Sequence, residues 1–284
     1  MAGNLYIDDI NVFDSFGLHV EEQGYNSFIQ WPPLKPVPYN DWYEEDGIDP
    51  DLSDPKLDRH TFYLRLSGTP SQSQIDALTT QLMSRGTHAI IDWNFPWAIT
   101  SAEFLGAKIT NRLNGLVRVD LTFVVNTPVL NNTTVTSNSN MPTCDDYKID
   151  GKPFTDYGVR ILSGTLASID QMPQRKENYR YDVDNIDGVV SGVTAECHTQ
   201  AYDATLHCLM RADTLSQLIT NYRSLQYQLS RVPGEHYIDV KATNKRYPCY
   251  YQSQRVKRFF PDGKIWLEFD IVVKIFTTPT TIAQ

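Results

Sequence analysis

Apolar and polar residues alternate strictly along two stretches of the chain, 117–125 and 267–275. A period of two is typical of a β-strand that buries one face and leaves the other in water. Asn114-Gly115 precedes the first stretch and Asp262-Gly263 precedes the second. These dipeptides favour a tight hairpin turn, because both of its central positions take positive φ. The pattern therefore predicts two similar β-hairpins, one near the end of each half of the chain.

The two alternating stretches also align with each other. When Asp120 is placed on Asp270, the inward-facing positions coincide, and a Thr-Pro pair follows soon after each strand. The predicted core residues are Val117, Val119, Leu121, Phe123 and Val125 in the first strand, and Leu267, Phe269, Ile271, Val273 and Ile275 in the second.

A shared pattern also opens the two halves of the chain. Tyr6-Ile7-Asp8 is followed by Phe16-Gly17-Leu18, and Ile149-Asp150 is followed by Tyr157-Gly158-Val159. Because internal similarity of this kind indicates a repeated unit, we expect two diverged copies of one domain. The first copy spans 1–129 and the second spans 146–284. A polar linker at 130–145 joins them, since 131–140 is almost free of apolar residues.

One helix is expected in each copy. In the first copy Thr69 is the predicted cap, Pro70 the first helical residue and Gly86 the stop. In the second copy Asp213 is the predicted cap, and Pro233-Gly234 follows the helix. The apolar stripes that predict helices packed on a sheet are Ile75, Leu78 and Leu82, and Leu215, Leu218, Ile219, Tyr222, Leu225 and Leu229.

The order of elements predicts the fold class. Each copy reads as strand, strand, long loop, strand, helix, strand (88–93 or 236–240) and terminal hairpin. This order predicts an α+β, mainly β fold. We expect two tandem copies of an antiparallel, sandwich- or barrel-like domain, each with one packed helix.

Charge and composition narrow the classes of function. The net charge of −9 argues against a nucleic-acid reader, which neutralises phosphates with Lys and Arg. No stretch approaches the length of apolar sequence that a membrane span requires, and no secretory signal is expected at the start. Cys144, Cys197, Cys208 and Cys249 form no CxxC pair, so we expect free thiols.

The long loop of the first copy is the stretch richest in candidate chemistry. Six carboxylates lie between Asp41 and Asp51, so calcium was considered, but their spacing does not match an EF-hand loop. Paired carboxylates for acid-base catalysis are possible in principle. A solvated or interface loop is the favoured interpretation. The loop of the second copy retains Lys176 and Gly188 at the places of Lys35 and Gly47.

No other pattern indicates a catalytic site. The sequence has no G-x-S-x-G, HExxH, P-loop or GxGxxG motif in a suitable context. The six histidines are scattered, and His198 and His207 lie in a strand-like run where ligation is not the favoured role. We therefore predict no catalytic residues, no cofactor-binding residues and no metal ligands, and expect the chain not to be an enzyme.

Several of these motifs together resemble a known family. Tyr6-Ile7-Asp8 with Phe16-Gly17-Leu18, the Pro33-Leu34-Lys35 segment followed by 41–47, and the single capped helix before a hairpin are similar to long-tailed bacteriophage tail proteins. The resemblance is to the tube-like domain of distal tail proteins and tail hubs. The second copy lacks the Trp-Glu-Glu run, and no separate galectin-like carbohydrate domain is visible.

The resemblance implies a structural role. A member of this family would be a virion component, assembled in the bacterial cytoplasm, that forms a ring with other tail proteins around a channel. DNA would pass through that channel without specific binding. Three chains with two copies each would supply six similar positions, and a ring of six chains is the rival arrangement. The alternative function is a carbohydrate-binding adhesion module, for which the exposed candidates are Trp31, Trp42, Trp93, Trp97 and Trp266.

Overall fold

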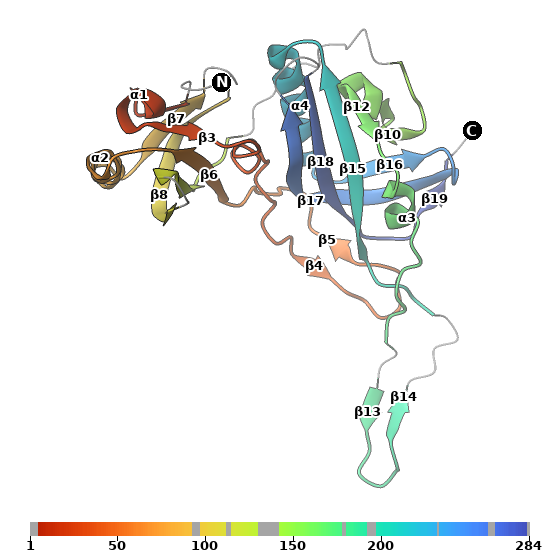
Figure 1. Cartoon of the computed structure of the whole chain (residues 1–284). Helices are drawn as coiled ribbons and strands as arrows, with labels where there is room; N and C mark the ends of the chain where they lie inside the picture. The colour runs from red at the N-terminus through yellow and green to blue at the C-terminus, as the bar shows by residue number, and fades with distance from the viewer. Residues whose placement is uncertain are drawn as a thin grey trace.

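A computed structural model of the whole chain shows two β-rich halves side by side (Figure 1). The structure describes residues 5–92, 97–111, 115–129, 142–177, 180–191, 197–231, 233–260 and 265–282. The expected linker segment 131–140, the Asp262-Gly263 turn, Asn114 and Trp93 lie outside these ranges.

The N-terminal half is built on one antiparallel sheet of seven strands in the order β2-β1-β7-β8-β9-β6-β3. Its strands are β1 (Leu5–Ile7), β2 (Ile10–Asn11), β3 (Leu18–Val20), β6 (His60–Gly68), β7 (His88–Asp92), β8 (Trp97–Asn111) and β9 (Val117–Val125). A short helix α1 (Val12–Phe16) and the longer α2 (Gln72–Met83) accompany the sheet.

The C-terminal half is built on a second antiparallel sheet, whose main path is β11-β10-β16-β17-β18-β15-β12. Its strands are β10 (Tyr147–Ile149), β11 (Lys152–Pro153), β12 (Val159–Ile161), β15 (Tyr202–Ala212), β16 (His236–Val240), β17 (Lys245–Phe260), β18 (Ile265–Ile275) and, at one edge of β17, β19 (Thr280–Thr281). Its helices are the 3-10 turn η2 (Phe154–Tyr157), α3 (Thr165–Ile169) and α4 (Leu215–Ser230). In chain order, the seven strands on this path occupy the same places as those of the first sheet.

The expected α+β, mainly β class with antiparallel sheets is confirmed. The alternating strands bury the predicted core residues, and of these only Val125 is partly exposed. Both hairpins open with a strand far longer than the sequence pattern indicated, β8 and β17. These strands extend beyond their shorter neighbours β7 and β16, and this excess length matters for the site described below.

Both long helices begin later than predicted. The capping residue of α2 is Ser71, not Thr69, because Ser71 and Gln74 form a reciprocal capping box. Pro70 therefore lies before the helix. The cap of α4 is Thr214, not Asp213, with the Thr214 hydroxyl accepting from the Gln217 N–H. In each case a hydroxyl one or two residues further on reaches the free amides better.

An Asp-His pair joins the first strand to the strand after the helix in both halves. Asp8 Oδ2 lies 2.7 Å from His88 Nδ1, and Asp150 Oδ2 lies 2.9 Å from His236 Nδ1. The second oxygen of each carboxylate accepts a backbone N–H, from Ala89 and from Tyr237. Burial alone would raise the pKa of both carboxyls, but these hydrogen bonds and the histidine charge lower it.

Two small hairpins lie outside the main sheets. One pairs β4 (Tyr39–Asn40) with β5 (Asp49–Pro50), and the other pairs β13 (Arg180–Asp182) with β14 (Val189–Ser191). In Figure 1 the β4–β5 hairpin lies beneath the C-terminal sheet, whereas the β13–β14 hairpin projects away from both halves. None of the described helices is long and apolar enough to cross a membrane.

Candidate association site

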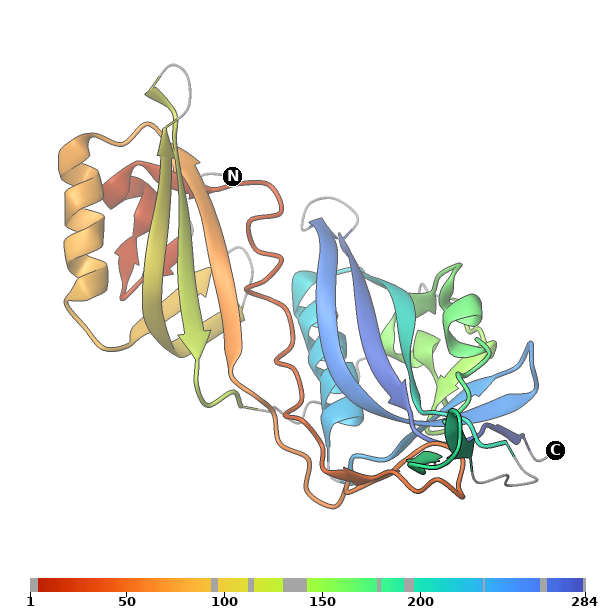
Figure 2. The same ribbon diagram turned by 90° about the horizontal axis from the view of Figure 1, so that it is seen from below.

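The segment 21–59 between β3 and β6, here called the docking loop, leaves the N-terminal sheet and runs along the C-terminal half (Figure 2). Backbone hydrogen bonds join it to that half along much of its length. The N–H of Leu34 donates to Gln252 O at 2.8 Å, and the N–H of Gly234 donates to Leu52 O at 3.0 Å. The loop is therefore part of the structure of the other half and not a solvated excursion.

The first part of the docking loop covers an open strand edge. β17 pairs with β16 only as far as Cys249, so the rest of the strand lacks a neighbour on that side. The loop lies along β17 in the antiparallel sense. Its contacts join Gln23 to Phe259, Asn26 to Lys257, Trp31 to Gln254 and Leu34 to Gln252. Because an open edge invites association, covering it protects the C-terminal sheet.

Trp31 anchors the docking loop in the core of the C-terminal half. Its side chain is fully buried, with ring centroids 4.8 Å from Tyr222 of α4 and 5.9 Å from Phe269 of β18. The backbone beside it is also held, because Tyr222 Oη donates to Ile29 O at 3.0 Å and Tyr251 Oη donates to Pro32 O at 2.9 Å. Burial raises the pKa of both tyrosines, which keeps them as donors.

The β4–β5 hairpin approaches the end of β18 so closely that its turn requires glycine. Gly47 has φ +76°, and a Cβ there would lie 1.8 Å from Phe276 O. Two hydrogen bonds hold the turn: Gly47 N–H to Thr199 O at 2.7 Å, and Ile48 N–H to Phe276 O at 2.8 Å.

The carboxylates of the docking loop are used as acceptors in this contact. Asp41 Oδ1 lies 2.6 Å from Lys176 Nζ, and the same ammonium donates to Trp42 O at 2.7 Å. Lys176 is buried by the loop. A buried ammonium needs such partners, since an unpaired charge there would be costly.

Asp46 is held in the same way at the other side of the turn. Its carboxylate accepts from Thr199 N at 2.7 Å, Thr199 Oγ1 at 3.0 Å and Thr278 Oγ1 at 3.0 Å. The Thr199 backbone N–H is the main cause that lowers the pKa of Asp46, although slight burial opposes it. His198 Nδ1, 3.7 Å away, also lowers that pKa.

The acidic residues therefore point at separate donors and do not converge. Within the part of the chain that the structure describes, no group of His, Cys, Asp and Glu could hold a metal ion. His207, the other histidine of the strand-like run, lies in β15 with Nδ1 2.6 Å from Asp270 Oδ1. His198 lies outside the strands, beside Asp46.

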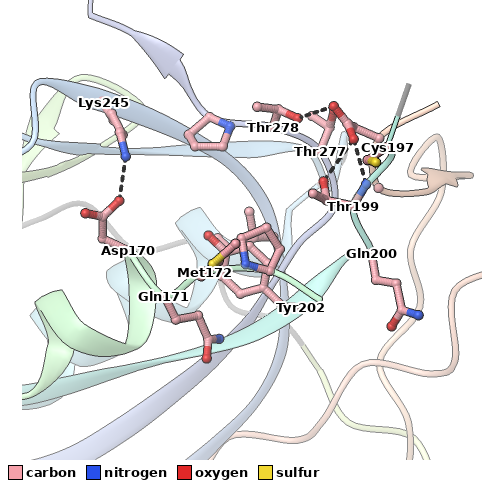
Figure 3. Close-up of a pocket in the computed structure, with 15 residues that line it drawn as sticks. Asp170, Gln171, Met172, Cys197, Thr199, Gln200, Tyr202, Lys245, Thr277 and Thr278 are labelled. Atoms are coloured by element: carbon pink, nitrogen blue, oxygen red, sulfur yellow. Dashed lines mark hydrogen bonds and ion pairs between the residues drawn. The ribbon is translucent and has the colours of Figure 1, made fainter. Parts of the chain in front are cut away.

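A pocket of about 350 Å³ lies beside the docked turn (Figure 3). Asp46 and Gly47 line it together with residues that follow α3 and β18. Its charged groups already have partners, because Asp170 Oδ1 lies 2.7 Å from Lys245 Nζ and accepts from Tyr247 Oη at 2.6 Å. The exposed thiol of Cys197 also lines it. The four cysteines form no disulfide, and burial raises the pKa of Cys208 and Cys249.

The tryptophans do not present a common stacking platform where the structure describes them. Trp31 is buried in the core, Trp42 is exposed on the docking loop, and Trp266 stacks on Phe260 with centroids 4.7 Å apart. The side chains of Trp93 and Trp97 lie outside the description. Burial of Trp31 removes one of the residues considered for binding carbohydrate.

Sequence reasoning missed the partner of the long loop. It favoured a solvated or interface role, but gave no reason to expect the other half of the same chain. A usable signal was present in Trp31-Pro32-Pro33-Leu34, whose apolar side chains are unusual for a loop in water.

No family model and no curated protein matches the sequence. Among solved structures, the chain is similar to the SPP1 Dit protein (gp 19.1), described as a paradigm of the hub adsorption apparatus in phages that infect Gram-positive bacteria. That likeness has 11% identity and a TM-score of 0.36, and covers 96% of this chain and 98% of that one. Because both values are low, the proposals below rest on the residues of this chain.

Proposed function

We propose that this chain is a non-enzymatic structural component of a bacteriophage tail, and that it forms a ring around the DNA channel with further copies of itself. The observation that carries the proposal is the head-to-tail contact within the chain. The docking loop of the N-terminal half covers the open edge of β17 in the C-terminal half and buries Trp31 there. The residues that resemble tail proteins, 33–35 and 41–47, lie in this loop.

The nature of that contact favours a ring. It is heterologous, since the surface given by one half differs from the surface received by the other. Contacts of this type generate closed rings or open filaments when they repeat. The two halves have the same strand order, so we propose that 1–129 and 146–284 are two copies of one domain joined by 130–145. The contact can then recur between one chain and the next.

Three chains are the proposed stoichiometry. Each chain already contains one head-to-tail contact, and three chains with two sheets each would give six similar positions. The net charge of −9 suits a wall that lets DNA pass, because it offers phosphate little attraction. We propose other tail proteins as the ring's neighbours and the virion as its location.

Electron microscopy tests this proposal. The purified chain, or tails that contain it, should show rings with a central channel, and mass measurement of the same particles should give their number of chains. Filaments without closure, or a chain found outside the tail in purified virions, would contradict the proposal.

A further inference from the structure

The C-terminal half has a loop of its own, 171–201, that matches the docking loop element for element. An isolated bridge closes each loop at its base, Leu34 to Leu57 and Arg175 to Thr199. A small hairpin follows in each, β4–β5 and β13–β14. The turn of each contains a glycine of positive φ, Gly47 and Gly188. Arg175 is 141 residues after Leu34, and Gly188 is 141 residues after Gly47. We call 171–201 the projecting loop.

The anchor positions of the two loops differ in their surroundings. Met172 lies 141 residues after Trp31 and, like Trp31, precedes a proline. Trp31 is 0% exposed, whereas Met172 is 94% exposed. A Cβ on Gly47 would collide with Phe276, whereas a Cβ on Gly188 meets nothing within 4 Å. The projecting loop thus has the features of a docked loop without a surface to dock on in its own chain.

The N-terminal sheet offers the matching surface. β8 pairs with β7 only as far as Ala102, so its remaining length has an open edge, as β17 does beyond Cys249. The registers correspond, since Lys108 lies opposite Asp120 and Arg255 lies opposite Asp270. Both strands bulge at equivalent places, after Phe104 and after Tyr251.

The open part of β8 is apolar and exposed. Val256, opposite Phe269, is buried, whereas its equivalent Ile109, opposite Val119, is 45% exposed. Leu105 at the bulge is 55% exposed. Exposed apolar side chains gathered on an open strand edge mark a site of association.

The charges on the two surfaces are complementary. In the docked contact Asp41 pairs with Lys176 at 2.6 Å. The residues at the equivalent positions are Asp182 on the projecting loop, 141 residues after Asp41, and Lys35 on the N-terminal half, 141 residues before Lys176. Both are exposed. An Asp on the giving loop and a Lys at the receiving base therefore recur at these positions.

We propose that a second copy of this chain occupies the open part of β8. The projecting loop of one chain lies along β8 of the next, with Met172 at the position that Trp31 takes within the chain and Asp182 paired with Lys35. This inference rests on the proposed function, because it specifies the contact that closes the ring.

Zero-length cross-linking tests the pairing directly. Equal amounts of isotopically heavy and light chain are mixed, allowed to assemble at high concentration, and treated with a carbodiimide, which joins a carboxylate to a neighbouring amine with loss of water. Mass spectrometry should find a peptide joining Asp182 to Lys35 with mixed isotopes. The Asp41–Lys176 peptide, with a single isotope, is the internal control.

Charge reversal provides the matched variants. Asp182→Lys and Lys35→Asp should each weaken self-association at least tenfold, and the two together should restore it. Asp184→Lys makes the same charge change on the same hairpin but should have little effect, because its equivalent Tyr43 remains exposed in the docked loop. Gly188→Ala should leave the monomer folded and reduce association.

The outcomes separate the two proposals. Rings that form without the Asp182–Lys35 peptide, while the control peptide is present, would overturn this inference and leave the proposed function standing. A chain that neither self-associates nor yields the peptide, alone or in tails, would overturn both.

Discussion

Trp31 and Tyr222 pack together with ring centroids 4.8 Å apart, although they belong to different halves of the chain. The Tyr222 hydroxyl also holds the backbone beside the tryptophan, through Ile29 O. The core of the C-terminal half is therefore completed by a side chain from the N-terminal half. A consequence is that the stabilities of the two halves are linked.

Trp31→Ala should destabilise the C-terminal half by about 3–5 kcal/mol, the usual cost of removing a large buried aromatic side chain. Denaturant unfolding followed by circular dichroism measures this change. Trp42→Ala removes an exposed tryptophan from the same loop and should change stability by about 0.5 kcal/mol or less. Equal losses in both variants would contradict the role given to Trp31.

Gly47→Ala and Gly188→Ala form a matched pair. Both glycines have positive φ, so both substitutions carry a backbone cost of about 1–2 kcal/mol. Only Gly47→Ala also drives a Cβ into Phe276 O. In the monomer we therefore expect the Gly47 variant to be clearly less stable than the Gly188 variant in thermal unfolding. Similar melting temperatures would mean that the β4–β5 turn is not docked as described.

His60 should make stability depend on pH. Burial lowers its pKa to about 4, although its hydrogen bond to Ser27 O opposes the shift. The unfolded chain, with an ordinary histidine pKa of about 6.5, binds the proton more readily. Stability is therefore full above about pH 6.5 and is lost as the pH falls toward 4.

A variant isolates this effect. Between pH 7 and pH 5 the wild type should lose roughly 2 kcal/mol more than His60→Gln, which keeps an N–H donor but does not titrate. Denaturant melts at the two pH values measure the difference. Parallel losses in both proteins would show that His60 is not responsible.

The strand pattern made much of the fold predictable. Alternation from Val117 to Val125 and from Leu267 to Ile275 placed the inward residues, and the stripe on α4 located its buried face. The helix starts were wrong, because several hydroxyl and carboxylate residues compete as caps within a few positions. Ser71 and Thr214 win through their geometry with Gln74 and Gln217.

The association site was much less predictable. Nothing local to Trp31, Asp41 or Asp46 identifies Tyr222, Lys176 or Thr199 as its partner. These contacts join residues far apart in sequence, and the long excess of β17 over β16 that creates the open edge follows from pairing and not from pattern. The match of Lys35 with Lys176 was visible, but its meaning required the ion pair that the structure shows.

Duplex DNA should not bind the isolated chain appreciably. With 34 acidic and 25 basic residues, the chain offers phosphates little net attraction. A gel shift at moderate salt should be negative at micromolar protein. Micromolar binding that weakens steeply with added salt would contradict the proposed channel lining.

The number of chains in the assembled ring tests the central claim most directly. Electron microscopy of tails that contain this chain, with rotational averaging of the ring, measures that number and the radius of each sheet. Three chains, with their six sheets alternating at one radius, is the predicted result. Six chains in one ring, or N-terminal and C-terminal sheets at different radii, would contradict it.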